Sequence, residues 1–157
     1  MKSLTTAILP LYLILAAHPA YAETAKPGAR ATQEAVVLGI IDFGNEGSKN
    51  VVTAPSTVAV GEEFKITITT FGSGCEREGT SSTIITATGA SIMVYDITAA
   101  IRPGVICAAV IKRLPHEVIL RFDKPGQGVI RVWGRRVGPD TPPVGVPVVL
   151  EHPVTIK

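Results

Sequence analysis

The sequence predicts an all-β protein, arranged as a two-sheet antiparallel sandwich with Greek-key connections. Two observations support this fold class. Several short segments alternate apolar and polar residues with a period of two, and Gly- and Pro-containing turns separate them. No segment shows the apolar spacing of an amphipathic helix. The pattern yields about eight strands, within a range of seven to nine, and a closed barrel of the same strands is the alternative.

The chain begins with a segment typical of a secretory signal peptide. Lys2 supplies the positive charge, residues 4–17 are apolar and uncharged, and Ala20-Tyr21-Ala22 fits a small-x-small cleavage site. The apolar stretch is shorter than the roughly 20 residues that cross a bilayer. We therefore expect residues 1–22 to be removed, leaving a periplasmic or secreted chain with no stable membrane insertion.

The rest of the chain suits one domain. Residues 23–34 are polar and contain Pro and Gly, which predicts a flexible N-terminal tail, and residues 35–157 are long enough to bury a core. The chain has 15 Lys and Arg against 13 Asp and Glu. This near balance argues against nucleic acid or an anionic membrane as a partner.

The first predicted strands lie in the segments 35–42 and 50–71. The first is a short apolar run, and turn material at 43–50 follows it. The second is interrupted at Gly61-Glu62 and then alternates strictly, as a half-buried strand of a sheet does. The side chains predicted to point inward are Phe64, Ile66 and Ile68, and those predicted to point outward are Glu63, Lys65, Thr67 and Thr69.

The remaining strands form two predicted hairpins and one further strand. Segments 82–88 and 90–97 flank a turn at Thr88-Gly89, and segments 116–122 and 129–135 flank the turn 123–128. The inward residues of the second hairpin are Val118, Leu120, Phe122, Ile130 and Val132. The last segment, 146–157, contains Pro147 and Pro153. Because proline lacks a backbone donor, we expect an edge or bulged strand there.

Cys75 and Cys107 are the only two cysteines. In an oxidising compartment such a pair indicates a disulfide, whereas a metal site favours close spacing of the C-x-x-C type. Cys75 follows the end of the strand 50–71, and Cys107 lies in the long connection 98–115. We therefore expect the bond to join two connections at one end of the domain, with Gly72 and Gly74 allowing the chain to bend before it.

Positive charge gathers at the same predicted end. Lys112, Arg113 and His116 precede one arm of the second hairpin, and Arg135 and Arg136 follow the other. These five residues, here called the basic rim, are candidates for binding an acidic partner. The competing interpretation is that they are solvated strand ends, whose charges prevent pairing with other chains.

Three stretches of this sequence resemble the small immunoglobulin-like domains of exported bacterial proteins. They read GEEFKITITTFGSGC, VYDIT and PHEVILRFDKPGQGVIRVWGR. The resemblance covers roughly residues 50–136 and implies an immunoglobulin-like sandwich in an exported protein of uncharacterised function. It carries over no catalytic residue. Antibody-type domains differ in having a wider cysteine spacing and a Trp packed on the bridge, whereas Trp133 follows both cysteines here.

Signals for catalysis or metal binding are weak. No HExxH, GxSxG, Walker or GxGxxG pattern occurs. Ser73, His116 and Asp96 supply the residue types of a catalytic triad, but their spacing does not indicate one. His152 falls in the inward register of the last strand, which favours a core position.

Two acidic pairs are candidates for calcium sites, Asp42 with Glu46 and Glu76 with Glu78, but neither has the oxygen set of a loop site. Copper transport would favour several Met or His residues, and after signal removal only Met93 and two His remain. We therefore expect no cofactor and no enzymatic activity.

The expected function is that of an exported, non-catalytic binding or structural module, which binds an unknown protein or cell-envelope component through its end loops or a sheet edge. A small periplasmic enzyme or metal carrier is the first alternative. A protease inhibitor on a sandwich scaffold, with the disulfide-bonded loop as a rigid insert, is the second.

Overall fold

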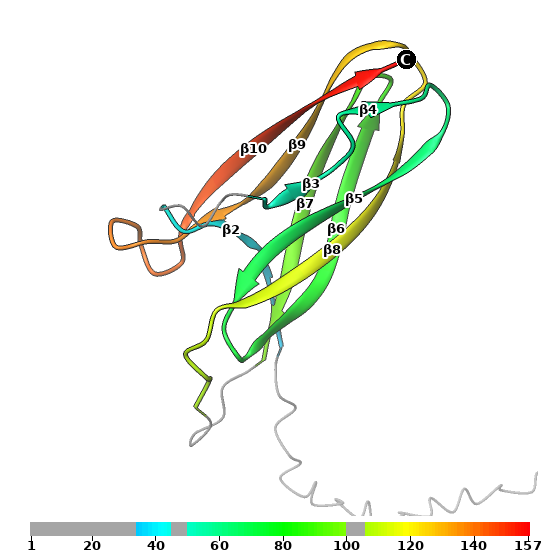
Figure 1. Cartoon of the computed structure of the whole chain (residues 1–157). Helices are drawn as coiled ribbons and strands as arrows, with labels where there is room; N and C mark the ends of the chain where they lie inside the picture. Colours follow the sequence, from blue (N-terminus) through cyan, green and yellow to red (C-terminus); the bar gives the residue numbers. More distant parts are fainter. Residues whose placement is uncertain (1–33, 45–49, 100–105) are drawn as a thin grey trace, which may run out of the picture. The chain divides into compact units, whose positions relative to one another are not determined.

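The computed structural model describes residues 34–44, 50–99 and 106–157, and Figure 1 traces their path. The predicted signal peptide 1–22, and the predicted tail except for Glu34, lie outside these residues. The described chain is all β and contains ten strands and no helix. Accordingly, none of the described residues belongs to a helix that is long and apolar enough to cross a membrane.

The strand bounds follow the chain order. They are β1 (Ala35–Leu38), β2 (Ile40–Asp42), β3 (Val52–Thr53), β4 (Thr57–Val58), β5 (Glu63–Gly72), β6 (Glu76–Thr86), β7 (Gly89–Thr98), β8 (Lys112–Arg121), β9 (Gly126–Arg136) and β10 (Val146–Ile156). Each predicted segment overlaps at least one of these strands. The chief differences are at the ends, since β6 and β8 begin six and four residues before the segments predicted at 82 and 116.

All ten strands belong to one mixed sheet. The pairs β5–β8 and β9–β10 are antiparallel over their whole length, and Figure 1 shows β5 beside β8 and β9 beside β10. The pair β6–β7 is also antiparallel, with one register shift between Glu78 and Ser81. The pairs β2–β9, β4–β10 and β7–β9 are parallel. The expectation of a purely antiparallel arrangement was therefore wrong. The alternation of apolar residues determines which face of a strand is buried, but it says nothing of which strand lies beside it.

The short strands β1 and β2 connect distant parts of this sheet. β1 pairs with the end of β7, while Ile40 of β2 pairs with Phe71 of β5 and Arg135 of β9. The hydrogen-bonded order thus runs β1-β7-β9-β2-β5-β3, with β4, β6, β8 and β10 attached at its sides. The described strands leave this sheet open, so the alternative of a closed barrel was wrong.

One apolar core lies between the inward faces of these strands. Its residues are Ile41, Val51, Val58, Ile66, Ile68, Phe71, Ala90, Ile92, Val94, Val118, Leu120, Phe122, Ile130, Val132, Val154 and Ile156. Every inward residue predicted for β5, β8 and β9 belongs to this core or packs against it. Their burial supplies the main stabilising term of the fold.

β10 confirms the prediction of an edge strand. It pairs with β9 without interruption from Val146 to Ile156, whereas β4 reaches only its last two residues. The N–H of Thr155 donates to the carbonyl of Ser56 at 2.9 Å, on the side away from β9. Because backbone groups alternate in direction along a strand, Pro147 and Pro153 lack their donors on that same free side. The two prolines therefore cost β10 no bond to β9.

Candidate functional site: the disulfide-bonded end of the domain

The predicted disulfide between Cys75 and Cys107 is present, with 5.3 Å between the two Cα atoms. Cys75 lies in the three-residue connection between β5 and β6, and Cys107 lies in the extended segment that precedes β8. The bond therefore joins two connections outside the strands, as predicted. Such a bridge fits an oxidising compartment outside the cytoplasm.

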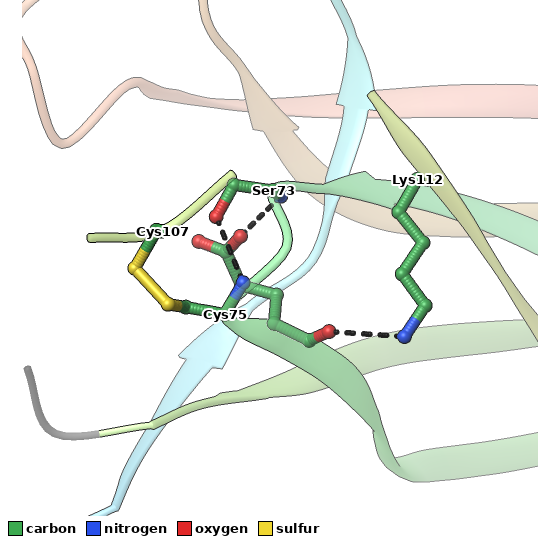
Figure 2. Close-up of a disulfide and its surroundings, with 5 residues drawn as sticks. Ser73, Cys75, Cys107 and Lys112 are labelled. Atoms are coloured by element: carbon green, nitrogen blue, oxygen red, sulfur yellow. Dashed lines mark hydrogen bonds between the residues drawn. A yellow bond between two sulfur atoms is a disulfide. The ribbon is translucent and has the colours of Figure 1, made fainter. Parts of the chain in front are cut away.

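A set of hydrogen bonds holds the β5–β6 connection around the bridge (Figure 2). The N–H of Cys75 donates to Ser73 Oγ at 3.3 Å, and the Glu76 carboxylate accepts the N–H of Ser73. The N–H of Gly74 donates to the carbonyl of Ala108 at 3.1 Å. A methyl group on Gly74 would lie 3.0 Å from Ala108 Cβ, so this close approach of the two connections favours glycine.

The segment 106–111, with the sequence ICAAVI, is apolar and extended. Ile106 is 93% exposed and Ile111 is 73% exposed, and this segment belongs to no strand. It borders a hollow of about 260 Å³, which is lined by Ile40, Phe43, Gly72, Ser73, Glu76, Ala109, Val110 and Ile111. An apolar segment is thus held at the surface, beside a small hollow, by the disulfide and one backbone hydrogen bond.

The structure brings four residues of the basic rim to this same end. The register places Arg113 opposite Phe71, Phe71 opposite Ile40, and Ile40 opposite Arg135, so these residues form one row across β8, β5, β2 and β9. Lys112 precedes Arg113 on β8, and Arg136 follows Arg135 on β9. The sequence-based prediction that both groups of cations share one end is therefore consistent with the register.

These four cations differ in their contacts. The Arg113 guanidinium lies 5.8 Å from the centre of the Phe71 ring, and Lys112 Nζ donates to the carbonyl of Glu76 at 3.5 Å (Figure 2). Arg135 donates to two backbone carbonyls, those of Leu38 at 2.5 Å and Val144 at 3.0 Å. Among the described residues, these three cations have no carboxylate partner within salt-bridge distance.

Arg136 instead forms an ion pair. Its Nε lies 2.5 Å from Oδ2 of Asp42, which is buried, while the arginine itself is half-exposed. Oδ1 of Asp42 accepts the N–H of Gly44 at 2.7 Å. Arg136 therefore compensates a buried carboxylate, and replacing it would disturb the fold as well as any binding surface.

His116 does not belong to an exposed rim. It is only 2% exposed, because β8 begins at Lys112 and continues the inward register of Val118 and Leu120 back to this residue. Its Nε2 lies 3.0 Å from Oδ1 of Asp96 and 3.0 Å from Oγ1 of Thr70. The prediction of His116 as a rim residue was thus wrong, since the strand extends further toward the N-terminus than expected.

Thr70, Asp96 and His116 form a buried polar cluster that sequence reasoning missed. Thr70 Oγ1 donates to Asp96 Oδ1 at 2.9 Å, and all three side chains are at least 97% buried. The signal was a polar residue in the inward register of three strands: Thr70 follows Ile66 and Ile68, Asp96 follows Ile92 and Val94, and His116 precedes Val118 and Leu120.

Gly39 covers this cluster between β1 and β2. A methyl group on Gly39 would lie 2.5 Å from Thr70 Cγ2 and 3.0 Å from Asp96 Oδ2. Its N–H donates to the carbonyl of Val94 at 2.8 Å, and its carbonyl accepts the N–H of Arg135 at 2.9 Å. Glycine at this position lets the chain pass directly over a buried carboxylate while bonding to β7 and β9.

The other candidate sites are arranged as follows. Of the three residues that supply the types of a catalytic triad, Asp96 and His116 are within hydrogen-bond distance of each other. The third, Ser73, instead accepts the N–H of Cys75 in the β5–β6 connection. Asp42 binds Arg136 and the Glu76 carboxylate binds a backbone N–H, while Glu46 lies outside the described residues. The described side chains include no group of three or more His, Cys, Asp or Glu placed to hold a metal ion.

His152 follows the inward register of β10, as predicted, and is half-buried. Its Nε2 is buried without a hydrogen-bond partner among the described residues.

Comparisons of this chain with protein-family models, with curated proteins and with solved structures give no match.

Proposed function

We propose that this protein is an exported, non-catalytic binding module with an immunoglobulin-like sandwich fold. It binds a protein or cell-envelope component of the periplasm or the extracellular medium through the disulfide-bonded end. The observation that carries the proposal is the exposed apolar segment 106–111, which the Cys75–Cys107 bridge holds beside a hollow and next to Lys112, Arg113 and Arg135.

The disulfide supports a binding role because it limits the motion of this apolar segment before a partner arrives. Ordering a surface segment on association costs roughly 0.5–1.5 kcal/mol for each immobilised side chain, and a covalent bridge reduces that cost in advance. Exposed apolar surface beside polar residues is typical of interaction sites. The combination favours a partner that inserts an apolar side chain.

The contacts of the cations support an acidic partner. Two carboxylates at this end already have partners, since Asp42 pairs with Arg136 and Glu76 accepts the N–H of Ser73. Lys112 and Arg113 have only a carbonyl and an aromatic ring as partners among the described residues. A partner carboxylate near them would gain a charge-assisted hydrogen bond.

The test is affinity capture from periplasmic or culture extract, with the oxidised mature protein as bait. The test variants are Ile111→Asp and Lys112→Glu, because both side chains are exposed and neither is part of the core. The matched controls are Ile119→Asp, exposed on β8, and Lys124→Glu, exposed in the β8–β9 turn. Arg135 and Arg136 are unsuitable because their side chains hold the fold together.

We expect a partner that the wild type and both controls capture and that both test variants lose. Capture should also weaken as salt is raised from about 0.05 to 0.5 M, because exposed charges are screened. Equal capture by all five proteins would place the binding surface elsewhere. Capture of nothing by the wild type would contradict the proposal.

A further inference from the structure

β6 is an edge strand with exposed side chains on both faces. It pairs only with β7 among the described strands, and it runs for eleven residues. Ile84 is 62% exposed and Ile85 is 46% exposed, although neighbouring residues of a strand point to opposite faces. A long, exposed edge strand with apolar residues is a site at which another strand can pair.

The directions of the backbone groups along β6 follow from its partner β7. The carbonyl of Val94 accepts the N–H of Gly39, on the side of β7 that faces away from β6. The even-numbered residues of β7 therefore bond away from β6, and the odd-numbered residues Ser91 and Met93 bond to it. Ser91 and Met93 lie opposite Ile84 and Ser82, so these two residues of β6 direct their backbone N–H and C=O groups toward β7. Because the direction alternates along a strand, the backbone groups of Ser81, Thr83 and Ile85 point away from β7, toward the free side of β6.

The described backbone leaves these outward groups without partners. Ser81, Thr83 and Ile85 each offer one N–H and one C=O on the free side of β6, and no backbone hydrogen bond of the described residues uses them. Alternate donors and acceptors at this spacing match those of a second strand with the same spacing.

The charge pattern identifies which strand would fit. Residues 79–90 contain no charged side chain and no proline. By contrast, β8 carries Lys112, Arg113, Glu117 and Arg121 together with Pro115, and β10 carries prolines on its free side. Charges and prolines protect an edge from pairing. Two copies of β6 can thus meet without like-charge repulsion.

We propose that two copies of this chain pair through their β6 strands, antiparallel about a two-fold axis at Thr83. This register places Thr83 opposite its counterpart in the second copy, and Ser81 of each copy opposite Ile85 of the other. All three resulting pairs use outward-pointing backbone groups, so each pair exchanges two backbone hydrogen bonds. A Thr–Thr pair is among the favourable cross-strand pairs, and a two-fold interface uses the same patch on both subunits. The two sheets become one continuous sheet.

The test uses the charge at the axis. Thr83→Lys places two ammonium groups opposite each other, Thr83→Glu does the same with two carboxylates, and an equimolar mixture of the two variants places unlike charges together. Thr83 is half-buried at the edge, where a long charged side chain can still reach solvent. Gln127→Lys, which adds the same charge at an exposed position on β9, is the control.

Sedimentation velocity of the oxidised mature protein between about 1 and 500 μM gives the readout. We expect dimers for the wild type and the control, monomers for each Thr83 variant alone, and dimers again for their mixture. A monomeric wild type at all concentrations would overturn the proposal. So would a dimer that both variants retain, or an open-ended series of larger species.

Hydrogen exchange of the wild type tests the same register without any variant. The amides of Ser81, Thr83 and Ile85 should exchange at least tenfold more slowly at 500 μM than at 1 μM, whereas the amides of Ser82 and Ile84 should not depend on concentration. Equal exchange of the three outward amides at both concentrations would overturn the proposal.

Discussion

The double substitution Cys75→Ala/Cys107→Ala should lower stability and leave the core folded. The bridge spans a sequence separation of 32 residues, for which the chain-entropy model gives about 3.7 kcal/mol at 25 °C. The native state offsets part of this figure. Segment 106–111 is exposed and keeps one backbone bond, from Gly74 to Ala108, so it regains some freedom once the bridge is gone. We therefore expect a loss of about 2–4 kcal/mol.

Thermal unfolding followed by far-UV circular dichroism measures this loss. For a domain of this size, a change of 1 kcal/mol moves the unfolding midpoint by roughly 3–6 °C, so a loss of about 2–4 kcal/mol should lower the midpoint by about 6–24 °C. At 10 °C the spectrum of the variant should retain its strand signal, because both cysteines lie outside the strands and neither belongs to the core. Reductant should lower the midpoint of the wild type and leave that of the double variant unchanged.

Two results would refute this reasoning. An unchanged midpoint in the double variant would mean that the bridge contributes nothing by constraining the unfolded chain. Loss of the strand signal at 10 °C would mean that the bridge is needed to form the core, and that it does not act merely as a link between two surface connections.

Two further predictions concern the buried polar cluster. Gly39→Ala should lower the free energy of unfolding by about 2–3 kcal/mol, because its methyl group would overlap Thr70 and approach the Asp96 carboxylate. The control is Gly138→Ala, where the nearest atom would be a carbonyl oxygen at 3.3 Å and the loss of free energy should be clearly smaller. Equal losses of the two variants in urea unfolding would contradict the close contact of Gly39 with Thr70. Thr70→Val keeps the side-chain shape but removes the donor to Asp96, so it should cost about 1–3 kcal/mol in the same assay, and a loss below about 0.5 kcal/mol would mean that this hydrogen bond contributes little.

Much of the disulfide-bonded end could be predicted from sequence. The Cys pair indicated the bridge, and the reversal of direction expected between the segments 116–122 and 129–135 placed Arg113 and Arg135 at one end. The prediction that these two segments pair as a hairpin was wrong, because β8 pairs with β5, whereas β9 pairs with β2, β7 and β10. His116 was misplaced because its strand was expected to begin there, whereas β8 begins at Lys112. The apolar segment 106–111 has no alternation, so its exposure beside the bridge could not be inferred from pattern.

The periodicity of the sequence by itself determined the all-β class and the buried faces of β5, β8 and β9, because a side chain's face depends only on its position along its own strand. The two prolines of the last segment determined the edge character of β10, since proline lacks a backbone donor wherever it occurs.

Apart from the β6–β7 hairpin, which the sequence predicted, only the tertiary structure decided which strands are neighbours. The parallel pairing of β7 with β9 joins segments that are far apart in the sequence. The same is true of the cluster of Thr70, Asp96 and His116: each lies in the inward register of its own strand, but only the packing of β5, β7 and β8 brings the three together. Such contacts depend on how whole faces fit, and a local pattern does not contain that information.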